Sequence, residues 1–193
     1  DTWCKVASED GLIGYVKKKF IGEIGELSAQ SVTNGYKEEF THIRKDYAIN
    51  MGWHQVTNPD ANSKIASVLT STKGVNVISP TWFYLNDNAG NLASLANMDY
   101  VNYCHQNGVE VWGLVSNLEN KDVDSTEVLT HTSKRQNLVN QIIAQAIQYN
   151  LDGVNVDFEA LSADSGDGFI QFVRELSLKC ANNGLVLPVD NYV

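Results

Sequence analysis

Hydrophobic and polar residues follow two alternating periods along the chain from residue 48 onward. Short apolar or alternating runs, typical of strands, are separated by segments in which apolar residues recur every third or fourth position, which is typical of helices. We expect strands at 48–53, 75–82, 109–115, 152–159 and 185–189, and helices at 59–72, 98–106, 132–150 and 167–182. Because helices alternate with strands, the pattern predicts βαβ units and a parallel sheet.

Each of the two longest predicted helices has one apolar stripe. The stripes consist of Leu138, Ile142, Ile143, Ala146 and Ile147 in the first, and of Phe169, Phe172, Val173, Leu176 and Cys180 in the second. Asn183-Gly184 follows the second helix, and glycine readily adopts the left-handed conformation that ends a helix. These stripes predict helices that pack against the sheet.

The predicted strand 152–159 is the most informative segment, because apolar and polar residues alternate strictly along it. Its two sets are Val154, Val156 and Phe158 on the one hand, and Asn155, Asp157 and Glu159 on the other. Successive side chains in a strand point to opposite faces, so the amide and the two acids share one face. A half-exposed antiparallel strand would also alternate, but the flanking helices favour a parallel sheet, which is covered on both faces. The polar row is therefore expected to point into an interior or a barrel mouth.

The segment Asp152-Gly153-Val154-Asn155-Val156-Asp157-Phe158-Glu159 resembles the signature of glycoside hydrolase family 18, Asp-Gly-x-Asp-x-Asp-x-Glu on the fourth strand of a TIM barrel. Asp152, Gly153, Asp157 and Glu159 match the signature, while Asn155 stands where the family usually has Asp. The segments 78–83 and 111–117 resemble the bacterial spore and cell-wall hydrolases of that family. The likeness covers about residues 40 to 193.

This resemblance implies a glycosidase that uses the 2-acetamido group of N-acetylglucosamine as its nucleophile. Glu159 would be the general acid and then the base, Asp157 would orient the acetamido group, and Asn155 would complete the catalytic set. Asp152 and Gly153 would have structural roles at the motif. A general acid must hold its proton near neutral pH, and both burial and a neighbouring carboxylate raise the pKa of an acid.

Further substrate-binding candidates lie at the ends of the first three predicted strands. Trp53 and Trp82 can stack on the apolar face of a sugar, and Tyr84 lies beside Trp82. A core or helix-facing position is the more common role of such a tryptophan, and that alternative stays open for each. Trp82 is the favoured candidate, because its segment runs into the loop at the barrel mouth. Asn117 ends the third strand and is a candidate hydrogen-bonding residue.

The N-terminal residues predict a different structure. Trp3–Ala7 alternates, Asp10-Gly11 is a turn signal, and Leu12–Val16 resumes the alternation, which indicates a hairpin. The hairpin resembles the last strands of a bacterial Src-homology-3-like module. We expect residues 1–35 to be the remnant of that module with a linker, and residues 36–193 to be the N-terminal part of the barrel.

The length of the chain limits how much of a barrel it can form. A (β/α)₈ barrel typically needs about 250 residues. The residues after the linker account for strands 1–5, so we expect the N-terminal half of a TIM barrel in a truncated chain. Unpaired sheet edges invite pairing with another chain, and a homo-oligomer of the fragment and loss of its activity are both expected possibilities.

Composition narrows the possible partners. The net charge of −9 argues against nucleic acid, and no run of apolar residues is long enough for a membrane span. Neither the cysteines nor the histidines have metal-binding spacing, so we expect no metal and no cofactor; Cys104 and Cys180 are expected to be buried and free. An N-acetylglucosamine-containing polysaccharide is the expected partner, with peptidoglycan favoured over chitin. We expect a secreted or cell-wall-associated bacterial protein.

Two alternatives remain at this point. A lectin-like relative would bind the polysaccharide without cleaving it, although such relatives usually lack the acid that Glu159 provides. A barrel of another activity could use Asp157 and Glu159 as ligands of Mg²⁺ or Ca²⁺, but the sequence shows no third ligand.

Overall fold

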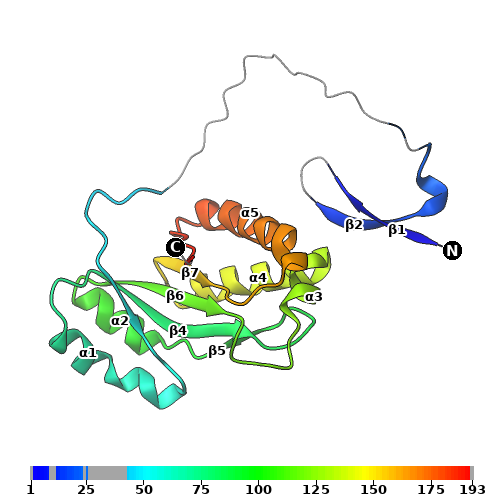
Figure 1. Cartoon of the computed structure of the whole chain (residues 1–193). Helices are drawn as coiled ribbons and strands as arrows, with labels where there is room; N and C mark the ends of the chain where they lie inside the picture. Colours follow the sequence, from blue (N-terminus) through cyan, green and yellow to red (C-terminus); the bar gives the residue numbers. More distant parts are fainter. Residues whose placement is uncertain (1, 9–11, 24, 26–42, 192–193) are drawn as a thin grey trace.

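The structure, a computed structural model, describes residues 2–8, 12–23, 25 and 43–191 of the 193-residue chain. A two-stranded hairpin precedes a larger body in which helices cover a mostly parallel sheet (Figure 1). The boundary expected at residues 35/36 lies outside the described residues, so that division of the chain stays a prediction.

The sheet of the larger body is built in chain order. Its path is β3 (Met51–His54), β4 (Val77–Leu85), β6 (Glu110–Ser116) and β7 (Gly153–Asp157), and all neighbours on this path are parallel. A short strand, β5 (Leu92–Ser94), pairs antiparallel with β4. Beyond β7, Val186 and Val189 form isolated parallel bridges with Gly153 and Val156. The expected fifth strand is thus present as two bridges beside β7.

Helical segments follow the strands of the sheet. They are η2 (Pro59–Lys64), a 3₁₀ helix continued by α1 (Ile65–Ser71), then α2 (Met98–Gln106), α3 (Ser125–Thr130), α4 (Thr132–Gln148), η3 (Ala163–Ser165) and α5 (Gly166–Asn182). The side chain of Asn58 accepts a hydrogen bond from the Ala61 N–H at the start of η2, and Asn97 does the same for Tyr100 at α2. Such caps satisfy the free N–H groups of a first helical turn.

The two faces of β7 are both covered. On one face, Phe158 stacks on Phe169 and Phe172 of α5, with ring centroids 6.0 and 5.3 Å apart. On the other face, the Asn155 side chain is fully buried and contacts Ser79 of β4. The helices therefore cover the apolar face, and the polar row points to the opposite side, as the alternation predicts.

Some details of the helices and loops differ from the expectation. Ile147 is 59% exposed, so the apolar stripe of α4 ends at Ala146. Between the expected strand 75–82 and the expected helix 98–106, β4 continues to Leu85 and the short strand β5 follows. The short helix α3 is additional; Asp124 caps it by accepting hydrogen bonds from Thr126 and Glu127. These short elements have too few residues to show a clear period.

The N-terminal hairpin joins β1 (Trp3–Ala7) and β2 (Ile13–Lys17), and a 3₁₀ turn, η1 (Lys18–Phe20), follows. Its turn residues 9–11 lie outside the described part. The hairpin contacts the larger body at the junction of α3 and α4: the Thr132 hydroxyl donates to the Ile13 carbonyl at 2.6 Å, and Tyr15 stacks on His131. Figure 1 shows the hairpin on the side of the molecule where α3 lies.

The larger body is a mixed α/β fold with a parallel sheet. Parallel strands followed by helices, in chain order, are the repeating unit of a (β/α)₈ barrel. Closure of such a barrel stays a prediction. Among the helices of the described residues, none combines the length and the apolar character that crossing a bilayer requires.

Candidate functional site

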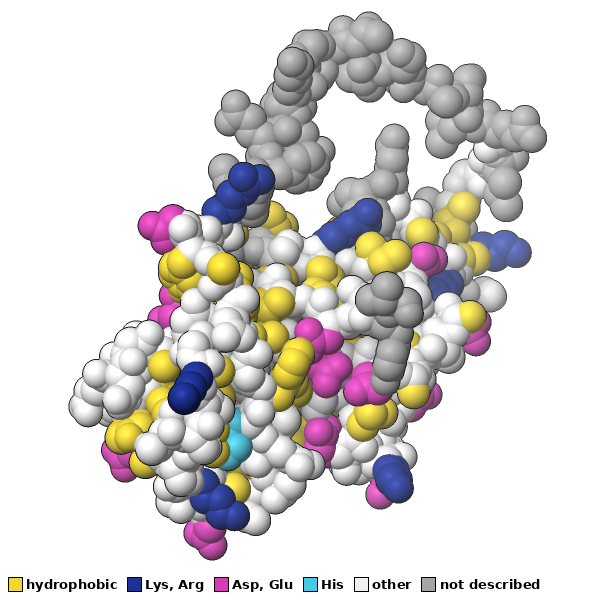
Figure 2. Space-filling model, turned by 60° about the vertical axis from the view of Figure 1, so that its left-hand side comes forward, with side chains coloured by type: hydrophobic (Ala, Val, Ile, Leu, Met, Phe, Trp, Pro, Cys, Tyr) yellow, Lys and Arg dark blue, Asp and Glu magenta, His cyan; other side chains and the backbone are white. Residues whose placement is uncertain are grey.

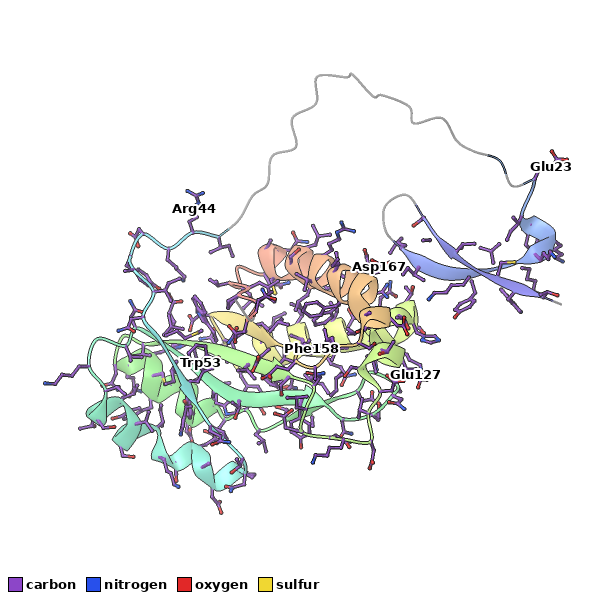
Figure 3. The ribbon with its side chains drawn as sticks, viewed as in Figure 1. Glu23, Arg44, Trp53, Glu127, Phe158 and Asp167 are labelled. Atoms are coloured by element: carbon purple, nitrogen blue, oxygen red, sulfur yellow. The ribbon has the colours of Figure 1, made fainter. Side chains whose placement is uncertain are left out.

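A pocket of about 800 Å³ opens at the carboxyl end of the sheet. Its wall includes two acids from the end of β7, a third acid from the segment that bridges to β7, and an exposed tryptophan from β3; the lining residues are Trp53, Asp157, Phe158, Glu159, Ala160, Leu161, Val189, Asp190 and Asn191. Figure 3 labels Trp53 on β3 and Phe158 just after β7. The carboxyl ends of parallel strands are where α/β barrels carry their active sites.

Asp157 is the last residue of β7, and Glu159 follows two positions later. Burial raises the pKa of the Asp157 carboxyl above its ordinary value of 3.8. Three neighbouring carboxylates raise it further, in decreasing order those of Glu159, Asp190 and Glu119. Figure 2 shows acidic side chains gathered near the middle of one face, with hydrophobic side chains beside them. Asp157 therefore takes up a proton more readily than an isolated aspartate, as acid–base sites require.

The backbone of Glu159 is held from the end of β6. Asn117, 8% exposed, accepts a hydrogen bond from the Glu159 N–H at 2.8 Å and donates one to the Glu159 carbonyl at 3.0 Å. It also donates to the Ser125 hydroxyl at 3.0 Å. The next residue, Ala160, has a positive φ of 51°, which side chains with a Cβ rarely adopt. Glu159 thus sits at a fixed, strained turn out of the strand.

Asn155 lies below Asp157 on the same face. Its amide nitrogen donates to the Ser79 hydroxyl at 3.3 Å and to an oxygen of Asp190 at 3.0 Å. Its amide oxygen is buried and has no hydrogen-bond partner among the described residues. The Asn155 side chain is fully buried, and its catalytic role stays a prediction.

Asp152 and Gly153 hold the start of β7. The Asp152 carboxylate accepts hydrogen bonds from the Val111 N–H and from His105, each at 2.8 Å, which ties β7 to β6 and α2. At Gly153, an added Cβ would come within 2.8 Å of the Val186 carbonyl oxygen and 2.9 Å of the Trp112 ring. Only glycine lets the three segments approach this closely; the structural role of Asp152 and Gly153 stays a prediction.

The aromatic candidates fall in different places. Trp53 is 59% exposed and lines the acidic pocket. Tyr84 lines a separate pocket of about 320 Å³ that Glu119 also borders. Trp82 offers no stacking surface, contrary to expectation: it is fully buried, its indole N–H donates to Asn62 at 2.8 Å, and its ring packs edge-on against Tyr100. Strand alternation places Trp82 on one face but does not say which face the helices cover.

Three residues near Asp157 escaped the sequence analysis. Asp190 follows a short apolar run, Ser79 lies inside a strand, and Glu119 lies in the loop after β6. Asn155 contacts Asp190 across 35 positions and Ser79 across 76. A parallel register between predicted strands would have brought Ser79 and Asp190 to the same edge of the sheet as Asn155. Glu119 gives no comparable signal.

The alternative in which Asp157 and Glu159 bind a metal ion gains no support from the described part of the chain. There, no group of three or more His, Cys, Asp or Glu side chains is placed to hold an ion.

Cys104 and Cys180 are buried and free, as expected, and burial raises the pKa of each thiol to about 12.

Solved structures with the same fold include several hydrolases. A chitinase from Chromobacterium violaceum is 19% identical to this chain, with a TM-score of 0.60. The match covers 74% of this chain and 45% of the chitinase. A class V chitinase from Pseudomonas fluorescens is 16% identical with a TM-score of 0.61, covering 74% and 44%. A spore cortex-lytic enzyme from Bacillus megaterium is 19% identical with a TM-score of 0.58, covering 72% and 33%. At these identities the likeness establishes the fold alone.

The chain spans less than half the length of each of these solved chains. No curated protein sequence matches it.

The Src-homology-3-like module expected at the N-terminus finds no support: the described residues between 2 and 23 form one hairpin and a 3₁₀ turn.

The sequence profile that matches the chain overturns the expected assignment to glycoside hydrolase family 18. The match covers residues 74–190, more than half of the chain, and includes β4, β6, β7 and Asp190. The family 18 assignment rested mainly on the segment 152–159, in which Asn155 already departed from the pattern, with weaker support from 78–83 and 111–117. By the longer match, the chain belongs to glycosyl hydrolase family 85.

Proposed function

We propose that the protein is a glycosidase that cleaves the bond next to N-acetylglucosamine in peptidoglycan or chitin, with the acetamido group of the substrate as nucleophile. The observation that carries this proposal is the placement of Asp157 and Glu159 in one pocket at the carboxyl end of the sheet. Its volume of about 800 Å³ is within the usual range for small-molecule sites. Family membership and the hydrolases that share the fold support the same class of reaction.

Glu159 would protonate the leaving oxygen and later deprotonate the attacking water. Its backbone is fixed by Asn117, so its carboxyl group starts from a defined position. Asp157 would hold the acetamido group by accepting a hydrogen bond from its N–H. Trp53 would offer its exposed ring to an apolar sugar face.

The setting of this activity is also part of the proposal. The parallel sheet would be the N-terminal half of a TIM barrel whose remaining strands complete the pocket, with residues 36–193 as its N-terminal part. Chitinases and cortex-lytic enzymes among the structural neighbours favour a protein that acts on extracellular or cell-wall polysaccharide. The exposed outer edge of β3 would be one place where a second chain or further strands could pair.

The test is hydrolysis by the protein expressed from its complete gene. Peptidoglycan and N-acetylglucosamine oligomers are incubated with the wild type, Glu159→Gln and Asp157→Asn, and reducing ends are counted. Asp164→Asn, which removes an exposed acid from η3, is the matched control. We expect turnover by the wild type and the control, and losses of about 100-fold or more in the two site variants.

Two further readouts separate the mechanisms. Retention at the anomeric carbon, together with slower cleavage of substrates whose acetamido group carries fluorine, supports the acetamido nucleophile. Inversion contradicts it. Binding of oligomers by a folded wild type that releases no reducing ends would instead support the lectin-like alternative.

A further inference from the structure

The buried amide of Asn155 has a defined orientation, and one acid sets it. The amide nitrogen donates to Asp190 at 3.0 Å and to Ser79 at 3.3 Å. A carboxylate can only accept hydrogen bonds, whereas a hydroxyl both donates and accepts. The amide must therefore turn its nitrogen toward Asp190, and Ser79 follows either orientation. The amide oxygen consequently faces away from Asp190, buried and unpartnered among the described residues.

Asp190 is held in place by the backbone of β7. Val189 forms a parallel bridge with Val156, and the Asp190 N–H donates to the Val156 carbonyl at 2.8 Å. Its carboxylate reaches Asn155 and lines the same pocket as Asp157 and Glu159. This geometry brings an acid from outside β7 to the point where the strand itself carries a neutral amide.

Charged groups face Asp157 from three segments. Glu159 follows β7, Asp190 lies on the bridging segment, and Glu119 lies beyond β6, where it accepts a hydrogen bond from the Ser116 hydroxyl at 2.5 Å. Of these three, only Asp190 also contacts Asn155. Asp190 is therefore the one acid of this set that can act on Asp157 both through its charge and through the orientation of the amide beneath it.

We propose that Asp190 is a positioning residue of the acidic pocket: it fixes the orientation of the Asn155 amide and adds a third carboxylate beside Asp157 and Glu159. The third carboxylate comes from the segment that bridges to β7. The importance of this arrangement for catalysis rests on the proposed function, but the arrangement itself is measurable without turnover.

Carboxyl and side-chain amide NMR signals of the chain test the proposal. The Asp157 carboxyl carbon is titrated with pH, and the Asn155 NH₂ signals are recorded, in the wild type, Asp190→Asn and Asp190→Ala. Asp190→Asn removes the charge but keeps an oxygen that can accept the hydrogen bond, so we expect a lower Asp157 pKa with one set of Asn155 signals. Asp190→Ala removes both, so we expect the lower pKa together with shifted or doubled Asn155 signals.

Two control variants separate charge from contact. Glu119→Gln should lower the Asp157 pKa and leave the Asn155 signals in place, because Glu119 does not contact the amide. Asp164→Asn should change neither, since it lies exposed on η3. An Asp157 pKa in Asp190→Asn equal to that of the wild type, or Asn155 signals unchanged in Asp190→Ala, would overturn the proposal. If Asp190→Ala fails to fold, the isosteric Asp190→Asn still decides the charge effect.

Hydrolysis gives an independent readout. In an active protein, the acidic limb of the pH–rate profile should move to lower pH in Asp190→Asn and stay in place in Asp164→Asn. A wild type without turnover would contradict the proposed function, while the NMR titration would still decide the role of Asp190.

Discussion

The side chain of Asn117 forms two hydrogen bonds with the backbone of Glu159: it accepts one from the Glu159 N–H at 2.8 Å and donates one to the Glu159 carbonyl at 3.0 Å. Sequence reasoning suggested that Asn117 binds substrate. That role stays a prediction: Asn117 lines a pocket of about 490 Å³ together with Glu159, and its side chain also hydrogen-bonds the Glu159 backbone and the Ser125 hydroxyl. These bonds hold the backbone of the proposed general acid in one position.

Replacing Asn117 should therefore impair both stability and turnover. Asn117→Ala leaves a buried N–H and a carbonyl unpaired, which costs about 1–3 kcal/mol in the free energy of unfolding. Misplacement of a reacting group by about 1 Å can reduce turnover about 100-fold. Asn117→Asp keeps the acceptor for the Glu159 N–H and should lose less of both. Denaturant unfolding and reducing-end assays check this; a destabilised Ala variant with wild-type kcat would contradict the positioning role.

The free energy of unfolding should vary with pH because Asp157 titrates differently in the folded and unfolded states. Its pKa in the folded protein is raised above 3.8 by burial and by neighbouring carboxylates. The folded state thus binds the proton more tightly than the unfolded state, so stability is highest below the unfolded pKa and falls as pH rises through the folded pKa. Asp157→Asn should be more stable than the wild type at pH 7, and the difference should vanish at pH 3. A constant difference across this range would argue against the raised pKa.

Gly153 should not tolerate even a methyl group. Its added Cβ would meet the Val186 carbonyl oxygen at 2.8 Å and the Trp112 ring at 2.9 Å. Overpacking of this kind typically costs about 1–3 kcal/mol. Gly166→Ala is the matched control, because nothing lies within 4 Å of its Cβ position and its φ of −54° suits alanine. Thermal unfolding should show a lower Tm for Gly153→Ala and an equal or higher Tm for Gly166→Ala.

The buried ion pair of α4 and α5 should matter more than an exposed one. Arg135 is fully buried; it donates to Glu175 from two nitrogens, at 2.9 and 3.0 Å, and to the Leu129 carbonyl at 2.7 Å. Removing one partner of a buried pair costs about 3–5 kcal/mol. We expect that loss for Glu175→Ala. Glu127→Ala, which breaks the solvent-accessible pair with Lys134, should cost about 1 kcal/mol or less. Equal losses in urea titrations would refute this difference.

The three cysteines should react unequally with a thiol reagent. Cys104 and Cys180 are buried with a pKa of about 12 each, so little thiolate is present at pH 8. Cys4 is partly exposed on β1. We expect one cysteine to react rapidly in the native protein and all three to react after unfolding in denaturant. Three fast equivalents without denaturant would show that the core opens readily.

The sequence predicted much of the sheet and the longer helices because their apolar residues repeat over many positions. Met98–Gln106 was expected and found with the same bounds, since a capping asparagine precedes it and Asn107-Gly108 ends it. β5 and α3 were missed, because three and six residues show no reliable period. The polar row of β7 was predicted by alternation alone.

The environment of that row could not be predicted in the same way. Alternation separates two faces but does not show how the neighbouring segments are aligned. The contact of Asn155 with Asp190 needs the register of a segment held by two isolated bridges. The burial of Trp82 depends on Asn62 and Tyr100, which come from two different helical segments. Such contacts arise from tertiary packing, which local sequence patterns do not encode.

The order of the parallel strands has a consequence for synthesis. From β3 to β7, and on to the bridging segment at 186–189, each parallel strand pairs with the one made before it. A nascent chain can therefore extend the sheet in step with its emergence from the ribosome, without inserting a late strand between earlier ones. The carboxylate of Asp190 can join those of Asp157 and Glu159 only after residue 190 has left the exit tunnel.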